Sequence, residues 1–201
     1  MNFLAHSLFG FNNAALIAGQ FCGDFVRGSD LSHLPDGVER GVRFHRFLDR
    51  FTDTHQVLEP TRGLIDQVPR RFAGIVVDVM FDHYLANRWT QVCDVSLDEH
   101  AKTVISALRS HEAHLPASLN RFTGLLEKEN ILQNNIHLPA VQYTLSRIAK
   151  RSDKFAVLAL SQDQLEPLSR RLKQPFDDFY PELNRAALHY IEQHTEIDYD
   201  G

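Results

Sequence analysis

Apolar residues recur mostly three and four positions apart along this chain, which is the spacing of one face of an α-helix. No stretch shows the sustained alternation of apolar and polar residues that is typical of a half-buried strand. Helical segments are expected over residues 1–10, 14–25, 38–51, 58–68, 70–89, 97–115, 118–129, 140–151, 155–160, 165–172 and 175–191. The pattern predicts an all-α protein with roughly eight helices of about twelve residues each.

The segment over residues 70–89 is apolar around most of its circumference, so it is expected to lie at the centre of a helical bundle. It nevertheless carries Asp78, Asp82 and His83. Asp78 and Asp82 are four residues apart and share one face of the predicted helix. Two stacked carboxylates repel each other unless a cation or a basic side chain lies between them. The segment therefore offers either metal ligands or a structural ion pair with an arginine.

A second polar group lies in the sequence R-F-H-R-F-L-D-R-F-T-D-T-H at residues 43–55. His45 and Asp49 are four residues apart, so a helix places them one above the other. Apolar residues form a stripe on the same segment, which leaves the imidazole and the carboxylate at the edge of the buried face. Helical bundles build metal sites in this way. An ordinary surface pair is the alternative for His45 and Asp49, and Asp53 is interpreted as a turn or cap residue beside them.

Two further polar residues occupy apolar surroundings near the start of the chain. Asp24 ends the apolar segment 14–25, where a buried carboxylate needs a partner; alternatively, it caps the loop that follows. His6 lies in the stripe of the first segment, either as a hydrogen-bonded core histidine or as support for a metal site. Gly19 and Gly23 are four residues apart and predict close packing of their segment against another helix.

The polar residues in apolar helical surroundings are all carboxylates and imidazoles. They are His6, Asp24, His45, Asp49, Asp78, Asp82 and His83. Manganese, magnesium and iron favour such mixed ligands, and a bound divalent ion would polarise a phosphoryl oxygen and lower the pKa of a bound water. The arginines close to these acids, which would hold phosphate oxygens, are Arg27, Arg40, Arg43, Arg46 and Arg50. The residues alone predict metal-dependent phosphoryl chemistry.

Composition narrows the class of protein. The chain has 201 residues, of which 43% are hydrophobic and 23% are charged, as expected for one globular domain over residues 1–201. Its net charge of -5 argues against a general nucleic-acid binder. The two cysteines match neither a zinc nor a redox motif, and no apolar run is long enough to span a bilayer. Since the start does not have the pattern of a signal peptide, the chain is predicted to be cytoplasmic.

A basic cluster, formed by Lys150, Arg151 and Lys154, stands out in the second half of this acidic chain. Solvated surface is one interpretation of the cluster. The other is a docking site for an acidic protein or a phosphate-bearing tail, because complementary charge steers such partners together. The sequence leaves both interpretations open, and it does not fix the oligomeric state.

Four stretches carry specific motifs. They are M-N-F-L-A-H at residues 1–6, G-D-F-V-R-G at 23–28, G-V-R-F-H-R-F-L-D-R-F-T-D-T-H at 41–55 and R-R-F-A-G-I-V-V-D-V-M-F-D-H-Y-L-A at 70–86. In this order they resemble the acyl carrier protein phosphodiesterases, also called acyl carrier protein hydrolases. The resemblance implies a single-domain helical bundle related to the HD-domain metal-dependent phosphohydrolases. It also implies hydrolysis of the phosphodiester that joins 4'-phosphopantetheine to a serine of holo-acyl carrier protein.

The resemblance implies site residues and a cofactor as well. Manganese is the expected ion, with magnesium or ferrous iron as alternatives, and the expected metal ligands are His45, Asp49, Asp78, Asp82 and His83. The resemblance also points to Asp24 as a catalytic residue. Arg43 and Arg46 are expected to act with it because they lie close to the acids in the sequence, and the residues expected to support them are His6, Arg27 and Asp53. Two features depart from the expected pattern. Asp82 precedes His83, unlike the H…HD…D order of HD enzymes, and Gln20 stands where asparagine is expected.

Two other classes of function stay open at this point. One is an HD-like phosphohydrolase that acts on a nucleotide, which would need an aromatic pocket for the base. The other is a non-catalytic helical module that binds a carrier protein and uses a metal for structure only. The masses of the products formed from holo-carrier protein would distinguish the three.

Overall fold

The computed structural model describes residues 2–194, and every regular element within that range is a helix. The elements are α1 (Phe3–Leu8), α2 (Ala14–Cys22), α3 (Asp36–Thr54), α4 (Leu58–Gly63), α5 (Arg70–Asn87), α6 (Trp89–Val92), α7 (Leu97–Ser110), η1 (Glu112–His114), α8 (Ala117–Lys128), α9 (Ile131–Asn134), α10 (Leu138–Ala149), η2 (Asp153–Leu158), α11 (Gln162–Arg171) and α12 (Lys173–His194). The all-helical prediction is therefore confirmed, while the proposed domain span of residues 1–201 extends beyond the described residues. The helices outnumber the expected eight because short helices such as α6 and α9 form within predicted connections.

Helix boundaries follow local chemistry. Pro35, Pro69 and Pro116 directly precede α3, α5 and α8, and proline suits this position because it lacks an N–H and fixes φ near the helical value. Helix α7 starts instead with a capping box, in which Ser96 and Glu99 each bond the backbone of the other. These residues fix the position at which each helix begins, and the helical repeat from that position determines which side chains face inward.

The closest helix pair is α2 and α3. A Cβ added to Gly19 would lie 2.6 Å from the Cα of Gly41, so the two backbones touch at this point. The close packing predicted from Gly19 is thereby confirmed. Contact without intervening side chains brings the end of α2 beside the middle of α3, where His45 lies.

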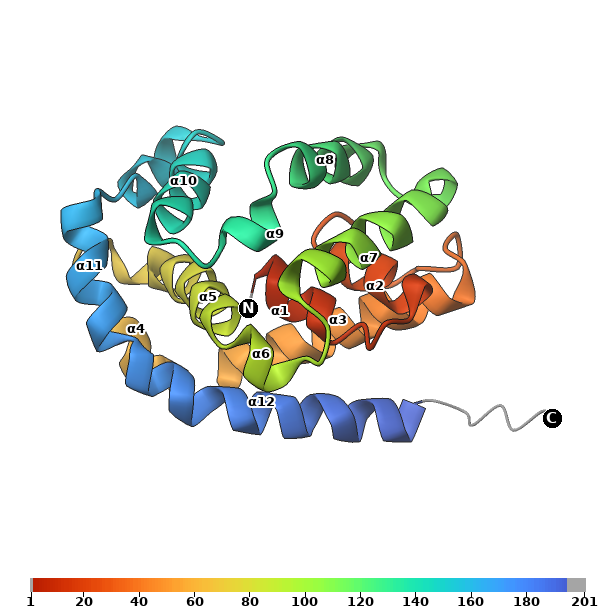
Figure 1. Ribbon diagram of the computed structural model, residues 1–201, viewed down its shortest axis with the longest axis horizontal. Helices are drawn as coiled ribbons and strands as arrows, with labels where there is room; N and C mark the ends of the chain where they lie inside the picture. Colours follow the sequence, from red (N-terminus) through yellow and green to blue (C-terminus); the bar gives the residue numbers. More distant parts are fainter. Residues whose placement is uncertain (1, 195–201) are drawn as a thin grey trace.

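Helix α5 packs between α1 on one side and α10 on the other (Figure 1). Most of its side chains are buried, among them Val76, Met80 and Phe81, as its apolar circumference predicts. The long helix α12 runs along one edge of the molecule and covers α3 through Phe179 and Tyr190. Between residues 2 and 194, no helix combines the length and the apolar character needed to cross a bilayer.

Candidate metal centre

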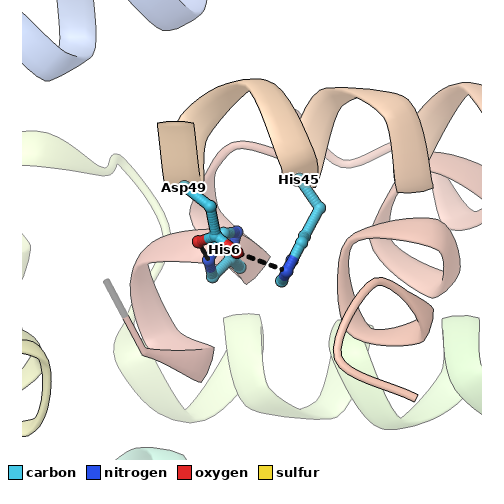
Figure 2. Close-up of side chains that lie close together, drawn as sticks. All are labelled: His6, His45 and Asp49. Atoms are coloured by element: carbon cyan, nitrogen blue, oxygen red, sulfur yellow. Dashed lines mark ion pairs between the residues drawn. The ribbon is translucent and has the colours of Figure 1, made fainter. Parts of the chain in front are cut away.

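Three ligand-type side chains from two helices converge at the edge of the interior: the two histidines are buried, and the aspartate is nearly half exposed. His6 comes from α1, and His45 and Asp49 come from α3 (Figure 2). The Nε2 atom of His6 lies 3.3 Å from Asp49 Oδ1, and Nε2 of His45 lies 3.0 Å from Asp49 Oδ2. One ligand atom from each residue fits within a mutual distance of 4.8 Å, so this group could hold a metal ion.

Gln20 of α2 sets the orientation of the His6 ring. Its Oε1 atom lies 2.9 Å from His6 Nδ1, and since an amide oxygen only accepts, Nδ1 donates the hydrogen bond. The neutral ring then carries its lone pair on Nε2, which faces Asp49 without the geometry of a hydrogen bond. A lone pair opposite a carboxylate is repelled unless a cation or a proton lies between them. Metal-binding histidines are commonly held by a hydrogen bond at the other ring nitrogen.

His45 is held by packing. Its ring stacks on that of His6, with the centroids 4.0 Å apart. On its other side lies Gly23, where an added Cβ would come within 2.3 Å of the ring atoms. Only glycine leaves room for the imidazole at this position. Asp24, the next residue, places Oδ1 3.7 Å from His45 Nε2 and is itself about half exposed, so it borders the group on the solvent side.

The charges of the group suit a cation. Burial lowers the pKa of His6, and the neighbouring His45 lowers it further, which favours the neutral imidazole. Burial alone would raise the pKa of Asp49, but its contacts with His45 and His6 outweigh this effect and hold the pKa well below the usual range. Two imidazole nitrogens and an ionised carboxylate are a suitable donor set for divalent manganese, iron or zinc.

The acidic residues of α5 lie outside this group. Asp82 is fully buried under the start of α1, where its carboxylate accepts hydrogen bonds from the backbone N–H groups of Leu4 and Ala5 at 2.7 and 3.2 Å. Burial raises its pKa to about 7, against the opposing effect of these hydrogen bonds. Asp82 therefore anchors the helix that carries His6, and its oxygens are occupied by backbone groups.

His83 and Asp78 also point elsewhere. His83 places Nδ1 2.7 Å from the carbonyl oxygen of Asn135 and ties α5 to the end of α9. Asp78 lines a separate surface cavity, beside Asp53 and Arg62.

 The cavity that Asp78 lines has a volume of about 450 Å³ and also contains Arg70. The seven polar residues gathered from the sequence thus occupy different surroundings: His6, His45 and Asp49 form the group, Asp24 borders it, Asp82 and His83 contact backbone groups, and Asp78 lines this surface cavity.

The predicted arginines and lysines occupy different surroundings. Arg43 is exposed and donates to Glu39 through Nε at 2.8 Å, on the face of α3 turned away from His45. Arg46 lies near the end of α2, where burial raises the pKa of Cys22 to about 11 and the positive charge of Arg46 opposes that rise. Arg27 is exposed in the loop after α2.

The remaining predicted residues lie at the surface. Asp53 accepts from Arg62 at 3.1 Å. Lys150 and Arg151 follow the end of α10, and the Lys154 ammonium lies 4.8 Å from the centre of the Phe155 ring.

A cavity of about 290 Å³ adjoins the group on the side of Asp24. It lies between the start of α1, the end of α2 and α10, and its walls include Asn2, Phe25, Phe122 and Arg151. Asp24 belongs both to this cavity and to the surroundings of His45, so a ligand in the cavity would reach the edge of the candidate metal centre.

Sequence reasoning gave His6 and Gln20 too little weight. Gln20 differs from the asparagine expected at this position, and it is a polar residue within the apolar run A-A-L-I-A-G-Q-F-C. A fully buried amide on such a helix needs a polar partner, and this requirement was the available signal.

Comparison with known proteins supplies a family. The model of the family described as "Acyl carrier protein phosphodiesterase" matches residues 1–183. A protein of that name from Yersinia pestis is 32% identical over 190 residues, which cover 94% of this chain and 98% of the relative. A protein of the same name from Klebsiella pneumoniae is 32% identical over 191 residues, covering 93% and 97%. No solved structure matches the chain.

Proposed function

Because this chain belongs to the acyl carrier protein phosphodiesterase family, we infer that it hydrolyses the phosphodiester between 4'-phosphopantetheine and a serine of holo-acyl carrier protein. Water attacks phosphorus, the bond from phosphorus to the serine oxygen breaks, and that oxygen takes up a proton. The products are apo-carrier protein and free 4'-phosphopantetheine. The observation that carries this proposal is the group of His6, His45 and Asp49, which Asp24 connects to a cavity.

The cofactor we propose is a divalent ion, with manganese first and magnesium or ferrous iron as alternatives. His6, His45 and Asp49 would hold it, since their donor atoms already converge and the lone pair of His6 Nε2 has no hydrogen-bond donor among the described residues. A bound ion supplies Lewis-acid activation of water and of a phosphoryl oxygen. Gln20 keeps the His6 ring in the tautomer that such binding needs.

Asp24 is the proposed acid–base residue. Its carboxylate stands between the imidazole of His45, 3.7 Å away, and the cavity, so it can orient the attacking water and accept its proton. A relation to the HD-domain phosphohydrolases is also proposed, and its basis is the resemblance of the sequence motifs.

The decisive experiment measures the mass of the carrier protein. Holo-acyl carrier protein is incubated with the protein and manganese, and both carrier and small products are weighed by mass spectrometry. Loss of the phosphopantetheine mass, together with release of free 4'-phosphopantetheine, is the expected result. Chelation of the metal should stop the reaction.

Other outcomes would replace this proposal. An unchanged carrier combined with hydrolysis of a nucleotide panel would favour a nucleotide phosphohydrolase. A protein that binds manganese and holo-carrier but hydrolyses neither substrate would favour a binding module.

A further inference from the structure

The cavity beside Asp24 has walls of opposite charge. Asp24 lies on one side, and two arginines of the α10 region, Arg147 and Arg151, lie on the other. The helices α8, α9 and α10 that contribute to this cavity lie on the side of the molecule opposite α12 (Figure 1). A phosphodiester that approached Asp24 would meet a negative charge, so a positive group in the same cavity is needed to hold it.

The two arginines differ in the partners they already have. Arg147 donates to Glu129 at 3.2 Å and lies over the ring of Tyr143, so much of its charge is balanced within the protein. Among the residues that the structure describes, no carboxylate comes within ion-pair distance of Arg151. Arg151 is therefore the cation of this cavity that is available to an anionic ligand.

We propose that this cavity binds the phosphopantetheine arm of the substrate, with Arg151 pairing with the phosphate oxygens opposite Asp24. The proposal rests on the proposed function and names a residue from the second half of the chain for the reacting phosphate. A guanidinium suits this task because it can offer two parallel N–H donors to one phosphate. The aromatic walls Phe25 and Phe122 and the polar side chains Asn135 and Thr144 match an arm that alternates methyl and methylene groups with amides.

A second cavity gives the arm room to extend. It has a volume of about 500 Å³ and shares Ile131, Tyr143 and Thr144 with the first. Together the two fall within the range of about 300–1,000 Å³ that is usual for sites of small organic ligands. The phosphate end then lies at Asp24, and the thiol end lies beyond Thr144.

Binding of free 4'-phosphopantetheine, measured by calorimetry in the presence of manganese, tests the role of Arg151. Arg151→Gln should weaken binding by roughly 10- to 100-fold, the effect of losing a charged hydrogen bond. Arg170→Gln, the same change at an exposed arginine of α11, should leave the affinity within about twofold. Equal binding by wild type and Arg151→Gln, or equal losses in both variants, would overturn the proposal.

A second variant tests the path of the arm. Thr144→Trp fills the wall shared by the two cavities, so it should weaken binding of 4'-phosphopantetheine about tenfold and leave binding of inorganic phosphate unchanged. Unchanged binding of 4'-phosphopantetheine in this variant, with an unfolding temperature equal to that of wild type, would contradict the path.

The failure of this proposal is distinguishable from the failure of the proposed function. If wild type releases phosphopantetheine from holo-carrier while Arg151→Gln binds the free arm normally, only the cavity assignment fails. If wild type releases nothing but binds 4'-phosphopantetheine through Arg151, the assignment holds and the proposed hydrolysis fails.

Discussion

Helices α3 and α5 carry the same kinds of polar residue, yet the side chains of these residues contact different groups. On α3, the side chains of His45 and Asp49 face the imidazole of another helix, and their donor atoms converge on one point. On α5, Asp82 faces two backbone N–H groups and His83 faces a backbone carbonyl. A buried polar side chain can bind a ligand only where backbone N–H or C=O groups do not already occupy its hydrogen-bonding atoms.

Asp82 supplies hydrogen-bond acceptors that the start of α1 lacks. The first N–H groups of a helix have no partner within the helix, and Asn2, which precedes α1, makes no side-chain cap. The carboxylate of Asp82 accepts from Leu4 and Ala5 instead. One carboxylate of the chain thus positions the helix of His6, and another, Asp49, faces His6 itself.

The largest effect is expected for Asp49→Asn. The change removes the negative charge between the two imidazoles, so manganese affinity should fall by more than about 100-fold, beyond the usual cost of losing an outer partner of a ligand. Calorimetric titration with manganese measures this, and release of phosphopantetheine should be lost in parallel. Asp94→Asn, an exposed control, should bind like wild type. Wild-type affinity in Asp49→Asn would remove Asp49 from the centre.

Gly23→Ala should have the next largest effect. The new methyl group would overlap the ring of His45, and relieving such overpacking costs about 1–3 kcal/mol. Displacement of the ring should lower manganese affinity by roughly 10- to 100-fold. Gly74→Ala is the matched control, since a Cβ there meets nothing closer than 3.6 Å. Equal affinities in the two variants would show that the His45 ring is not a ligand.

Gln20→Leu tests the orientation of His6. Leucine keeps the bulk of the side chain but cannot accept from Nδ1, so the ring loses its fixed tautomer and manganese affinity should fall about tenfold. Gln91→Leu, at an exposed position of α6, serves as the control. Gln20→Glu, which restores an acceptor, should recover part of the affinity; if it recovers none while Gln20→Leu is weak, packing rather than hydrogen bonding explains the loss.

Asp82→Asn should change metal affinity least, by less than about twofold, because Asp82 contacts no donor atom of the group and the amide oxygen of asparagine can still accept from one backbone N–H of α1. Its effect is on the pH dependence of stability. The folded-state pKa of about 7 lies above the ordinary value of 3.8, so the folded protein binds this proton more tightly. The stability that Asp82 contributes is therefore present at low pH and lost as pH rises from about 4 to 7.

Chemical unfolding of wild type and Asp82→Asn across this pH range checks the sign. The free energy of unfolding of wild type relative to the variant should fall by up to about 1.4 kcal/mol per pH unit. Because the other titrating groups are the same in both proteins, their contributions cancel in the difference between the two free energies of unfolding. A relative stability that rises with pH would show that the backbone hydrogen bonds outweigh burial.

The sequence predicts the helical framework because periodicity is a local property. It also brings His45 and Asp49 together, since four residues on one helix fix their relation. It cannot show that His6 joins them, because α1 and α3 meet only through packing over a distance of 39 residues in the chain. Nor can it separate Asp82 from the ligands: its partners are backbone amides, which every residue type carries.

The contact of Gly19 with Gly41 has a consequence for variation of this protein. Where two helices rest on each other's backbones, their separation does not depend on the size of any side chain between them. The spacing between the carboxylate that follows α2 and the imidazole on α3 is thus insulated from substitutions elsewhere in the core. Sequence libraries that keep these two glycines can diversify the surrounding apolar residues widely and still present the same arrangement of donor atoms.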